Sequence, residues 1–236
     1  MKLFKRLVLI ILIVIIIVLT VIILNGYKLY KTSLDKISLQ DKISQIKENE
    51  NYTSIKDVPD YYKKAIIAVE DHRFYEHGPV DYIAIARAIV SNAKAKEFNE
   101  GGSTITQQVA KNLYFITEDD FISRKVAEIF MAIDLEKNYS KDDILEFYIN
   151  TIYFGEGYYG IKQASNGYYN KEPISMNLYE ATMLAGVPNA PSVYAPTINP
   201  NLAKNRQRKV IRDMVEYGYL SQKEADKIIS MQDNIE

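Results

Sequence analysis

The chain has 236 residues, a formal net charge of −1 and no cysteine. The near-neutral charge gives no general attraction to nucleic acid, and the lack of thiols excludes disulfide bonds and cysteine chemistry. Two histidines without any cysteine argue against a structural zinc site. No internal repeat is present, and the length that remains after the apolar N-terminal run suits a single domain.

An apolar run lies near the N-terminus. Residues 7–24 are LVLIILIVIIIVLTVIIL, with Thr20 as the only polar side chain. A helix of this length spans about 27 Å, which is close to the thickness of the bilayer hydrocarbon. A cleaved signal peptide is the rival interpretation, but the run is long for one and no A-x-A pattern follows it. The sequence therefore predicts an uncleaved membrane anchor.

Basic residues flank this run unequally. Lys2, Lys5 and Arg6 precede it, whereas Lys28 and Lys31 follow it. The positive-inside rule assigns the more basic flank to the cytoplasm. We therefore expect a single-pass protein of the cell membrane, with a cytoplasmic N-terminus and the later part of the chain outside the cytoplasm.

From about residue 58 onward, apolar residues recur at helical spacing and no stretch alternates cleanly with period two. A mainly α fold is expected, with a short strand pair within 149–159. Helix starts are predicted from prolines and capping side chains at Pro59, Pro79, Thr104, Ser140, Asn177, Pro200 and Ser221. One apolar stripe comprises Ile122, Val126, Ile129, Phe130 and Ile133. The expected organisation is a cytoplasmic N-terminus at 1–6, a membrane span at 7–24, a stalk at 25–56 and one domain at 57–236.

Two adjacent carboxylates follow an apolar helical stretch. Glu70 and Asp71 open the segment EDHRFYEHG at 70–78, which also contains Arg73 and two histidines. Acid–base catalysis needs a carboxylate whose pKa is set by burial and by neighbouring charges. A solvated, charged helix terminus is the alternative, and this segment alone does not decide between the two.

A second set of residues suits an anion. GGSTITQQ at 101–108 combines a glycine pair with a hydroxyl-rich helix start, whose free backbone N–H groups attract phosphate, and Lys111 lies one to two turns further on. Arg124, Lys125 and Glu128 share a later helix, on which Arg124 and Glu128 are four residues apart and can pair. These residues predict a cationic face for a diphosphate. A flexible loop and a surface ion pair are the alternatives.

Glycines and aromatic rings are interspersed in NTIYFGEGYYG at 150–160. A tight turn packed beneath ring faces suits this composition, and so does a sugar-stacking surface. We favour the structural interpretation here. The segment LAGVPNAP at 184–191 is expected to end a helix in a rigid scaffold loop.

Taken together and in this order, several segments resemble the peptidoglycan glycosyltransferase domain of family 51. They are EDHRFYEHG at 70–78, GGSTITQQVAKN at 101–112, RKVAE at 124–128, KDDILEFYINTIYFGEGYYGI at 141–161 and LYEATMLAGVPNAPSVYAP at 178–196. That domain occurs in class A penicillin-binding proteins and in monofunctional, membrane-anchored transglycosylases. The resemblance extends over about residues 55–215, and the length of the chain predicts the monofunctional type.

The resemblance implies a two-lobed helical domain distantly similar to lysozyme. It also implies polymerisation of lipid II into β-1,4-linked glycan, with release of undecaprenyl diphosphate and inversion at the donor anomeric carbon. Lipid II and the growing glycan strand are the expected partners, and penicillin-binding transpeptidases are further candidates. No cofactor is required by the sequence.

Roles for individual residues also follow from the resemblance. Glu70 is the expected general base that takes the proton of the acceptor hydroxyl, and Glu128 matches a second glutamate that positions the cations and the donor. The leaving diphosphate needs electrostatic stabilisation more than protonation. The expected substrate-binding residues are Lys111, Arg124, Lys125, Ser103, Thr104, Gln107 and Gln108, with Asp71, Arg73, Phe74 and His77 supporting the first motif.

One position departs from the family pattern. Many relatives carry a basic residue four positions before the Arg-Lys pair, whereas this chain has Asp120 there, preceded by Glu118 and Asp119. Either another residue supplies the cation, or a divalent metal (Mg or Mn) bridges these carboxylates and the diphosphate. The metal is a hypothesis to which no ligand residues are assigned.

Two rival functions come from other classes. A lysozyme-like glycan hydrolase would also use paired carboxylates, but a neutral sugar leaving group does not need Lys111, Arg124 and Lys125. A catalytically inactive cell-wall scaffold is the other rival, although the motifs are intact except at Asp120. Release of fragments from polymeric glycan would favour the hydrolase, and absence of lipid II turnover would favour the scaffold.

Overall fold

The computed structural model describes residues 2–95 and 101–233, so the extreme ends of the predicted first and last segments lie outside the described residues. Within that part the chain is mainly helical, as predicted, and contains no strand. The long helices are α1 (Lys2–Lys36), α2 (Leu39–Lys47), α3 (Asp60–Glu70), α4 (Tyr82–Ala95), α5 (Ile105–Ala110), α6 (Phe121–Asn138), α7 (Lys141–Thr151), α8 (Gly160–Tyr169), α9 (Leu178–Gly186), α10 (Pro191–Tyr194), α11 (Pro200–Glu216) and α12 (Gln222–Asp233). Short helical turns are η1 (Ile55–Asp57), η2 (Lys111–Phe115), η3 (Pro173–Ser175) and η4 (Val187–Asn189).

Capping side chains start many of these helices where the sequence predicts them. Capping boxes form at Thr104, Ser140 and Asn177. The prediction that α4 begins at Pro79 is wrong. Asp81 caps this helix instead, because its carboxylate accepts hydrogen bonds from the N–H groups of Ile83 and Ala84, both at 2.9 Å, and so satisfies two otherwise unpaired donors.

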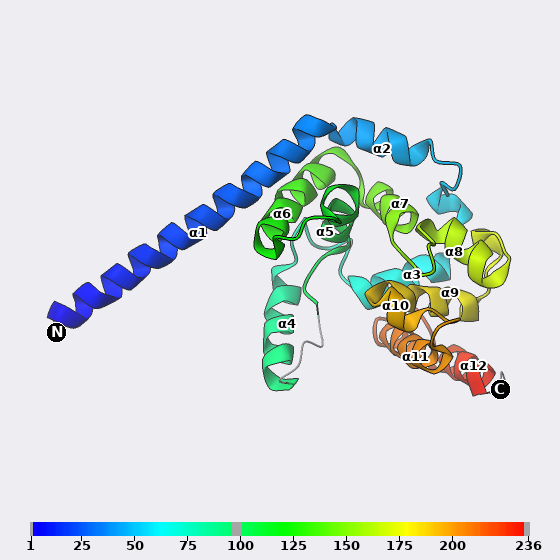
Figure 1. Cartoon of the computed structure of the whole chain (residues 1–236). Helices are drawn as coiled ribbons and strands as arrows, with labels where there is room; N and C mark the ends of the chain where they lie inside the picture. The colour runs from blue at the N-terminus through cyan, green and yellow to red at the C-terminus, as the bar shows by residue number, and fades with distance from the viewer. Residues whose placement is uncertain (1, 96–100, 234–236) are drawn as a thin grey trace.

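The N-terminal helix α1 extends well beyond the apolar run. It has 35 residues, and among the described helices it alone is long and apolar enough to cross a membrane. Its apolar part projects from the rest of the molecule, and its C-terminal part passes alongside α6 (Figure 1). Residues 25–36, expected to belong to a stalk, therefore continue the helix, and Leu39 and Ile43 of α2 are buried as well.

Two groups of helices build the core of the remaining chain. α3, α9 and α11 pack on one another, while α5 packs on α6 and α7. The largest fully buried side chains are mostly aromatic and include Tyr62, Phe74, Phe115, Phe147, Tyr148 and Phe154. This arrangement brings the end of α3, the start of α5, the first half of α6 and the middle of α11 to one cleft.

The expected strand pair within 149–159 is a single antiparallel bridge between Tyr153 and Tyr159. Between them the backbone turns through positive φ at Gly155 (84°) and Gly157 (83°), with Glu156 at 52°. Glycine tolerates these angles because it has no Cβ, so the glycines of this motif serve the turn.

The apolar stripe predicted on α6 does not face the core. Ile122 and Ile133 are 54% and 46% exposed, whereas Val126 and Phe130 contact α1. The buried face of α6 consists of Ser123, Ala127, Glu128, Met131, Ala132 and Leu135. The stripe therefore marks the side of α6 on which α1 docks.

Candidate active site

A cleft of about 530 Å³ is lined by charged and amide side chains from several helices. Glu70 comes from α3, Gln108 from α5, Lys125 and Glu128 from α6, and Arg206 from α11. Carboxylates, amides and cations predominate in its lining, as expected for a site that handles a polar, anionic ligand.

Glu70 is the last residue of α3, and its side chain is 11% exposed. Its Oε2 atom accepts a hydrogen bond of 2.9 Å from Nε2 of Gln108, and Nη2 of Arg206 lies 3.8 Å from Oε1. Burial raises the pKa of the Glu70 carboxyl above its ordinary value, although the Gln108 hydrogen bond and the Arg206 charge oppose this rise. Oε1 has no hydrogen-bond partner in the described part of the chain, so it is free to accept a proton.

Asp71 ties the end of α3 to the start of α5. Its Oδ1 atom lies 2.6 Å from Nε2 of His77, and its Oδ2 atom accepts a 3.0 Å hydrogen bond from the N–H of Ile105. Burial lowers the pKa of His77, but the hydrogen bonds to Asp71 and to the Gly78 carbonyl outweigh it, and the net shift is upward. Asp71 therefore fixes the backbone beside Glu70.

Arg73, Phe74 and His77 of the first motif do not line the charged cleft. Arg73 pairs with Asp81, the cap of α4, and Phe74 is fully buried beneath the ammonium of Lys141, which lies 4.7 Å from its ring centroid. Arg73 and His77 line a separate cavity rather than the charged cleft. Their geometry indicates that they shape the segment that carries Glu70.

The glycine-hydroxyl motif divides its residues between structure and the cleft. Thr104 and Gln107 form the capping box of α5, in which the side chain of each accepts a hydrogen bond from the backbone N–H of the other. The Thr104 hydroxyl also donates to the Pro79 carbonyl at 2.9 Å. Gln108 holds Glu70, and Ser103 accepts a 3.2 Å hydrogen bond from Nζ of Lys125. Ser103, Gln107 and Gln108 line the cleft.

The predicted cations gather around one buried carboxylate. Glu128 is 0% exposed, and its Oε2 and Oε1 atoms lie 2.6 Å from Nζ of Lys125 and 3.5 Å from Nε of Arg124. Burial lowers the pKa of Lys111, and the positive charge of Arg124 lowers it further. Lys111 forms no ion pair within the described residues. The structure therefore brings together the cationic group that the sequence predicts.

Two basic cleft residues on α11 were not predicted from the sequence. Arg206 and Lys209 are three residues apart, on one face of the helix, and both line the cleft near Glu70. The basic run KNRQRK at 204–209 was the available signal. Asn112 is a further cleft residue, and its side-chain nitrogen is buried without a hydrogen-bond partner in the described part of the chain.

Asp120, the acidic residue that precedes α6, caps this helix. Asp120 is the N-cap of α6, and its Oδ1 atom accepts hydrogen bonds from the N–H groups of Ile122 at 3.1 Å and Ser123 at 3.2 Å. Hydrogen bonding to the Ser123 side chain, and then to the N–H groups of Ser123 and Ile122, holds the pKa of its carboxyl below the ordinary value. Its carboxylate therefore already has partners within α6.

One other group of side chains could hold a cation. Among the described residues, Asp71, His77 and Asp81 place their ligand atoms within 4.8 Å of one another. Asp81 already pairs with the guanidinium of Arg73, and Asp71 with His77. Because a fixed positive charge already compensates this group, it fits a metal poorly.

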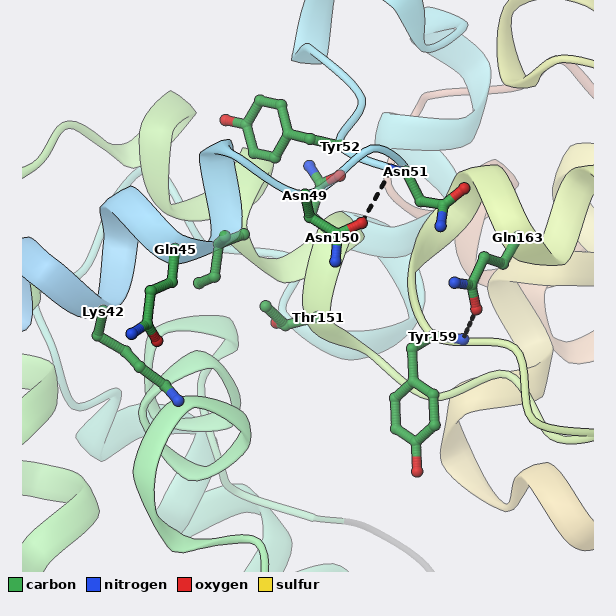
Figure 2. A pocket seen from close by; sticks show the side chains of 10 residues that line it. Lys42, Gln45, Asn49, Asn51, Tyr52, Asn150, Thr151, Tyr159 and Gln163 are labelled. Carbon is green, nitrogen blue, oxygen red and sulfur yellow. Dashed lines mark hydrogen bonds between the residues drawn. The ribbon is translucent and has the colours of Figure 1, made fainter.

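A smaller pocket of about 180 Å³ lies behind α7, between α2 and α8 (Figure 2). Amide, hydroxyl and aliphatic side chains with Lys42 line it, and it contains no carboxylate. Several of its polar groups serve the local backbone: Asn49 accepts a hydrogen bond from the N–H of Asn51, and Gln163 accepts one from the N–H of Tyr159. It therefore offers no carboxylate that could act as a general base, and the charged cleft is the candidate active site.

The fold and the cleft together define the class of protein. It is a helical protein with an N-terminal helix of membrane-crossing length, and its cleft holds a partly buried carboxylate and a cationic group. The sequence model of the transglycosylase family matches residues 39–215. The chain belongs to this family.

Penicillin-binding proteins are among its relatives. Over 178 residues it is 46% identical to penicillin-binding protein 1F of Bacillus subtilis, covering 75% of this chain and 25% of that protein. Over 182 residues it is 44% identical to penicillin-binding protein 1A of Neisseria flavescens, covering 77% and 23%. The crystal structure of penicillin-binding protein 1A from Haemophilus influenzae aligns with a TM-score of 0.46 and 20% identity, over 75% of this chain and 17% of that one. The chain spans about a quarter of the length of the curated relatives.

Proposed function

We propose that this chain is a peptidoglycan glycosyltransferase that polymerises lipid II into β-1,4-linked glycan and releases undecaprenyl diphosphate. The observation that carries the proposal is that a candidate general base and a group of cations lie close together. A carboxylate with a raised pKa and a free oxygen atom stands at one part of the cleft, and three cations surround a buried glutamate at another.

Glu70 serves as the general base. Its Oε1 atom takes the proton of the acceptor 4-hydroxyl as the hydroxyl oxygen attacks the donor anomeric carbon, because an alcohol is a poor nucleophile until a base assists it. Attack from the side opposite the diphosphate inverts that carbon. Gln108 and Arg206 orient the carboxylate and favour its ionised form.

Lys111, Arg124 and Lys125 stabilise the departing diphosphate. The bond between the anomeric carbon and the diphosphate oxygen breaks, and negative charge accumulates on a group that is already a weak base. Such a group needs fixed positive charge rather than a proton, and preorganised cations in a partly dry site supply it. Glu128 pairs with Arg124 and Lys125 on α6, and Lys125 lines the cleft.

The N-terminal helix places this chemistry at a membrane. The basic residues Lys2, Lys5 and Arg6 favour a cytoplasmic N-terminus, so the cleft would lie outside the cytoplasm. Lipid II and the growing strand are the proposed partners, and transpeptidases that cross-link the product are a further candidate. The domain proper would comprise residues 57–236, after the stalk at 25–56.

Replacement of Glu70 with Gln tests the proposal. The amide keeps the size of the side chain but cannot take a proton, so we expect loss of glycan formation from undecaprenyl lipid II with an unchanged circular dichroism spectrum. Normal polymerisation by Glu70→Gln would refute the assignment of the base. Release of soluble fragments from polymeric glycan by the native chain would instead favour the hydrolase, and absence of both activities the scaffold.

A further inference from the structure

The contact between α1 and α6 depends on a glycine. Gly26 is buried, and a Cβ atom added there would lie 2.4 Å from Cβ of Val126 and 2.9 Å from the carbonyl oxygen of Ser123. Glycine is a poor helix former, so its place inside a helix of 35 residues needs a packing reason. The reason here is that only glycine lets the two helices approach this closely.

Contacts further along the two helices fix their relative direction. The Tyr27 and Tyr30 rings lie 5.2 Å and 5.7 Å from the Phe130 ring, and the Tyr30 hydroxyl donates to the carboxylate of Asp134. Because residue numbers increase together on both sides of the contact, α1 and α6 run parallel here. The first turn of α6 therefore lies nearest to the apolar part of α1 (Figure 1).

The parallel packing of α1 on α6 fixes the height of the cations relative to the membrane. Gly26 lies two residues after Leu24, where the apolar run ends, which is about 3 Å of helix rise. Its contacts on α6, Ser123 and Val126, bracket Arg124 and Lys125 in the sequence. The cationic turn of α6 thus lies at the height at which α1 leaves the hydrocarbon.

Two further observations agree with this level. Successive helix residues are separated by about 100°, so Val126 and Phe130 occupy one face of α6, and Arg124 and Glu128 the opposite face. Packing of one face against α1 therefore leaves Glu128 and its partner Lys125 on the part of α6 that lines the cleft. Phe121 and Ile122 precede the cations on the membrane side and are 59% and 54% exposed, which suits contact with lipid.

We propose that Gly26 is a positioning residue that holds Lys111, Arg124 and Lys125 at the level of the lipid phosphates. The cleft would then take a diphosphate whose polyprenyl tail stays in the bilayer. A diphosphate attached to a long tail cannot rise far above that level without drawing hydrocarbon into water, so the cations must meet it there. This inference rests on the proposed function for the identity of the ligand, but the level of the cations is measurable without it.

The first experiment measures depth. The chain has no cysteine, so Ile122→Cys introduces a unique site for a fluorescent label in the full chain, reconstituted in phosphatidylglycerol–phosphatidylcholine vesicles. Lipids that carry quenchers at defined depths should locate the label near the boundary between headgroups and hydrocarbon. We expect Gly26→Leu to shift that depth and Asn25→Gln, which adds bulk at the neighbouring exposed position, to leave it unchanged. An unchanged depth in Gly26→Leu would overturn the proposal.

The second experiment separates positioning from folding. Gly26→Leu should polymerise undecaprenyl lipid II in vesicles at least about tenfold more slowly, because small displacements of a binding group are costly. Its rate with a lipid II analogue that carries a short, water-soluble tail should stay within about twofold of the native rate, since that ligand can follow the displaced cations. Equal losses on both substrates would show a merely structural role and refute the positioning role, as would no loss on either.

A glycine exchange provides the matched control. Gly26→Ala alone should slow the reaction in vesicles, and addition of Val126→Gly should recover part of the loss, because it removes the Val126 atoms that the new methyl group meets and leaves only its contact with the Ser123 carbonyl. Failure of the exchange to recover any activity would contradict the contact as the cause. If the native chain polymerises neither substrate, the proposed function fails, while the depth measurement still decides the position of the cations.

Discussion

At the scale of single residues, burial gives the two glutamates of the cleft different tasks. Glu128 is fully buried between Lys125 and Arg124, so its removal would leave two cations without their common partner, a loss on the order of 3 kcal/mol for a buried pair. Glu70 has one cation nearby, Arg206 at 3.8 Å, and one amide hydrogen bond from Gln108 at 2.9 Å. The first arrangement suits a group that holds cations, and the second suits a group that takes a proton.

The pH dependence of the reaction should report the environment of Glu70. A general base works in its deprotonated form, so the rate falls as the pH drops through its pKa. Because the pKa of Glu70 is raised, this acid limb should lie above the ordinary glutamate value of 4.5. Gln108→Leu removes a hydrogen bond that favours the charged carboxylate, so the limb of kcat/KM should move to higher pH by about one unit.

The same substitution at Gln45 is the control for this pH profile. Gln45 lies in the smaller pocket behind α7, outside the charged cleft, so Gln45→Leu should leave the limb in place. If the acid limb of kcat/KM in Gln108→Leu remains at the native pH, or moves to lower pH, the assignment of Glu70 as the base is contradicted.

At the scale of elements, helix starts position the site. The capping box of α5 orients Gln108 toward Glu70, and the cap of α6 places its first turn, with Arg124 and Lys125, beside the cleft. Asp120, as the N-cap of α6, therefore contributes to the geometry of this helix. Arg206 and Lys209 bring additional positive charge to the same cleft from α11.

Substitutions at Asp120 separate its capping role from a role in metal binding. Asp120→Ala removes the acceptor of two backbone N–H groups and should lower the Tm by about 3 °C, whereas Asp120→Asn keeps a capping oxygen and should melt close to the native chain. Thermal unfolding followed by circular dichroism measures both. If neither Asp120→Asn nor a chelator changes the polymerisation rate, the hypothesis of a bridging metal at this residue is wrong.

At the scale of the whole molecule, α1 has two parts with different environments. Side chains of its apolar part are exposed in the structure, whereas Gly26 and Tyr30 are buried where α1 meets α6. Almost any apolar sequence can be solvated by lipid in the first part. The second part needs side chains whose shapes fit the surface of α6. The membrane span and the docking segment are thus separable along one continuous helix.

Exchange of residues 7–21 for an unrelated apolar sequence of equal length tests this division. We expect polymerisation in vesicles to remain within about twofold of the native rate, because these residues are all exposed in the structure and a helix of the same length still spans the bilayer. Comparison with a variant altered only at Gly26 measures the docking segment in the same assay. A large loss on exchange of 7–21 would show that the span itself takes part in the reaction.

The sequence by itself determined the features that depend on local chemistry. The apolar run of α1, the capping boxes at Thr104, Ser140 and Asn177 and the helical class all follow from neighbouring residues. The family motifs also indicated Glu70, Glu128 and the cations. Local rules misplaced the start of α4 because Pro79 suits a first helical position, whereas the Asp81 carboxylate accepts hydrogen bonds from two N–H groups and so caps the helix later in the chain.

Only the tertiary structure decided which side chains meet across long stretches of the chain. Arg206 reaches Glu70 because α11 packs on α3, and no spacing within either segment predicts that contact. Likewise, periodicity showed that α6 has an apolar stripe but could not tell whether its partner is the core or another helix. The close approach of Gly26 to Val126 settled this, since packing depends on the shapes of both surfaces and local sequence describes only one of them.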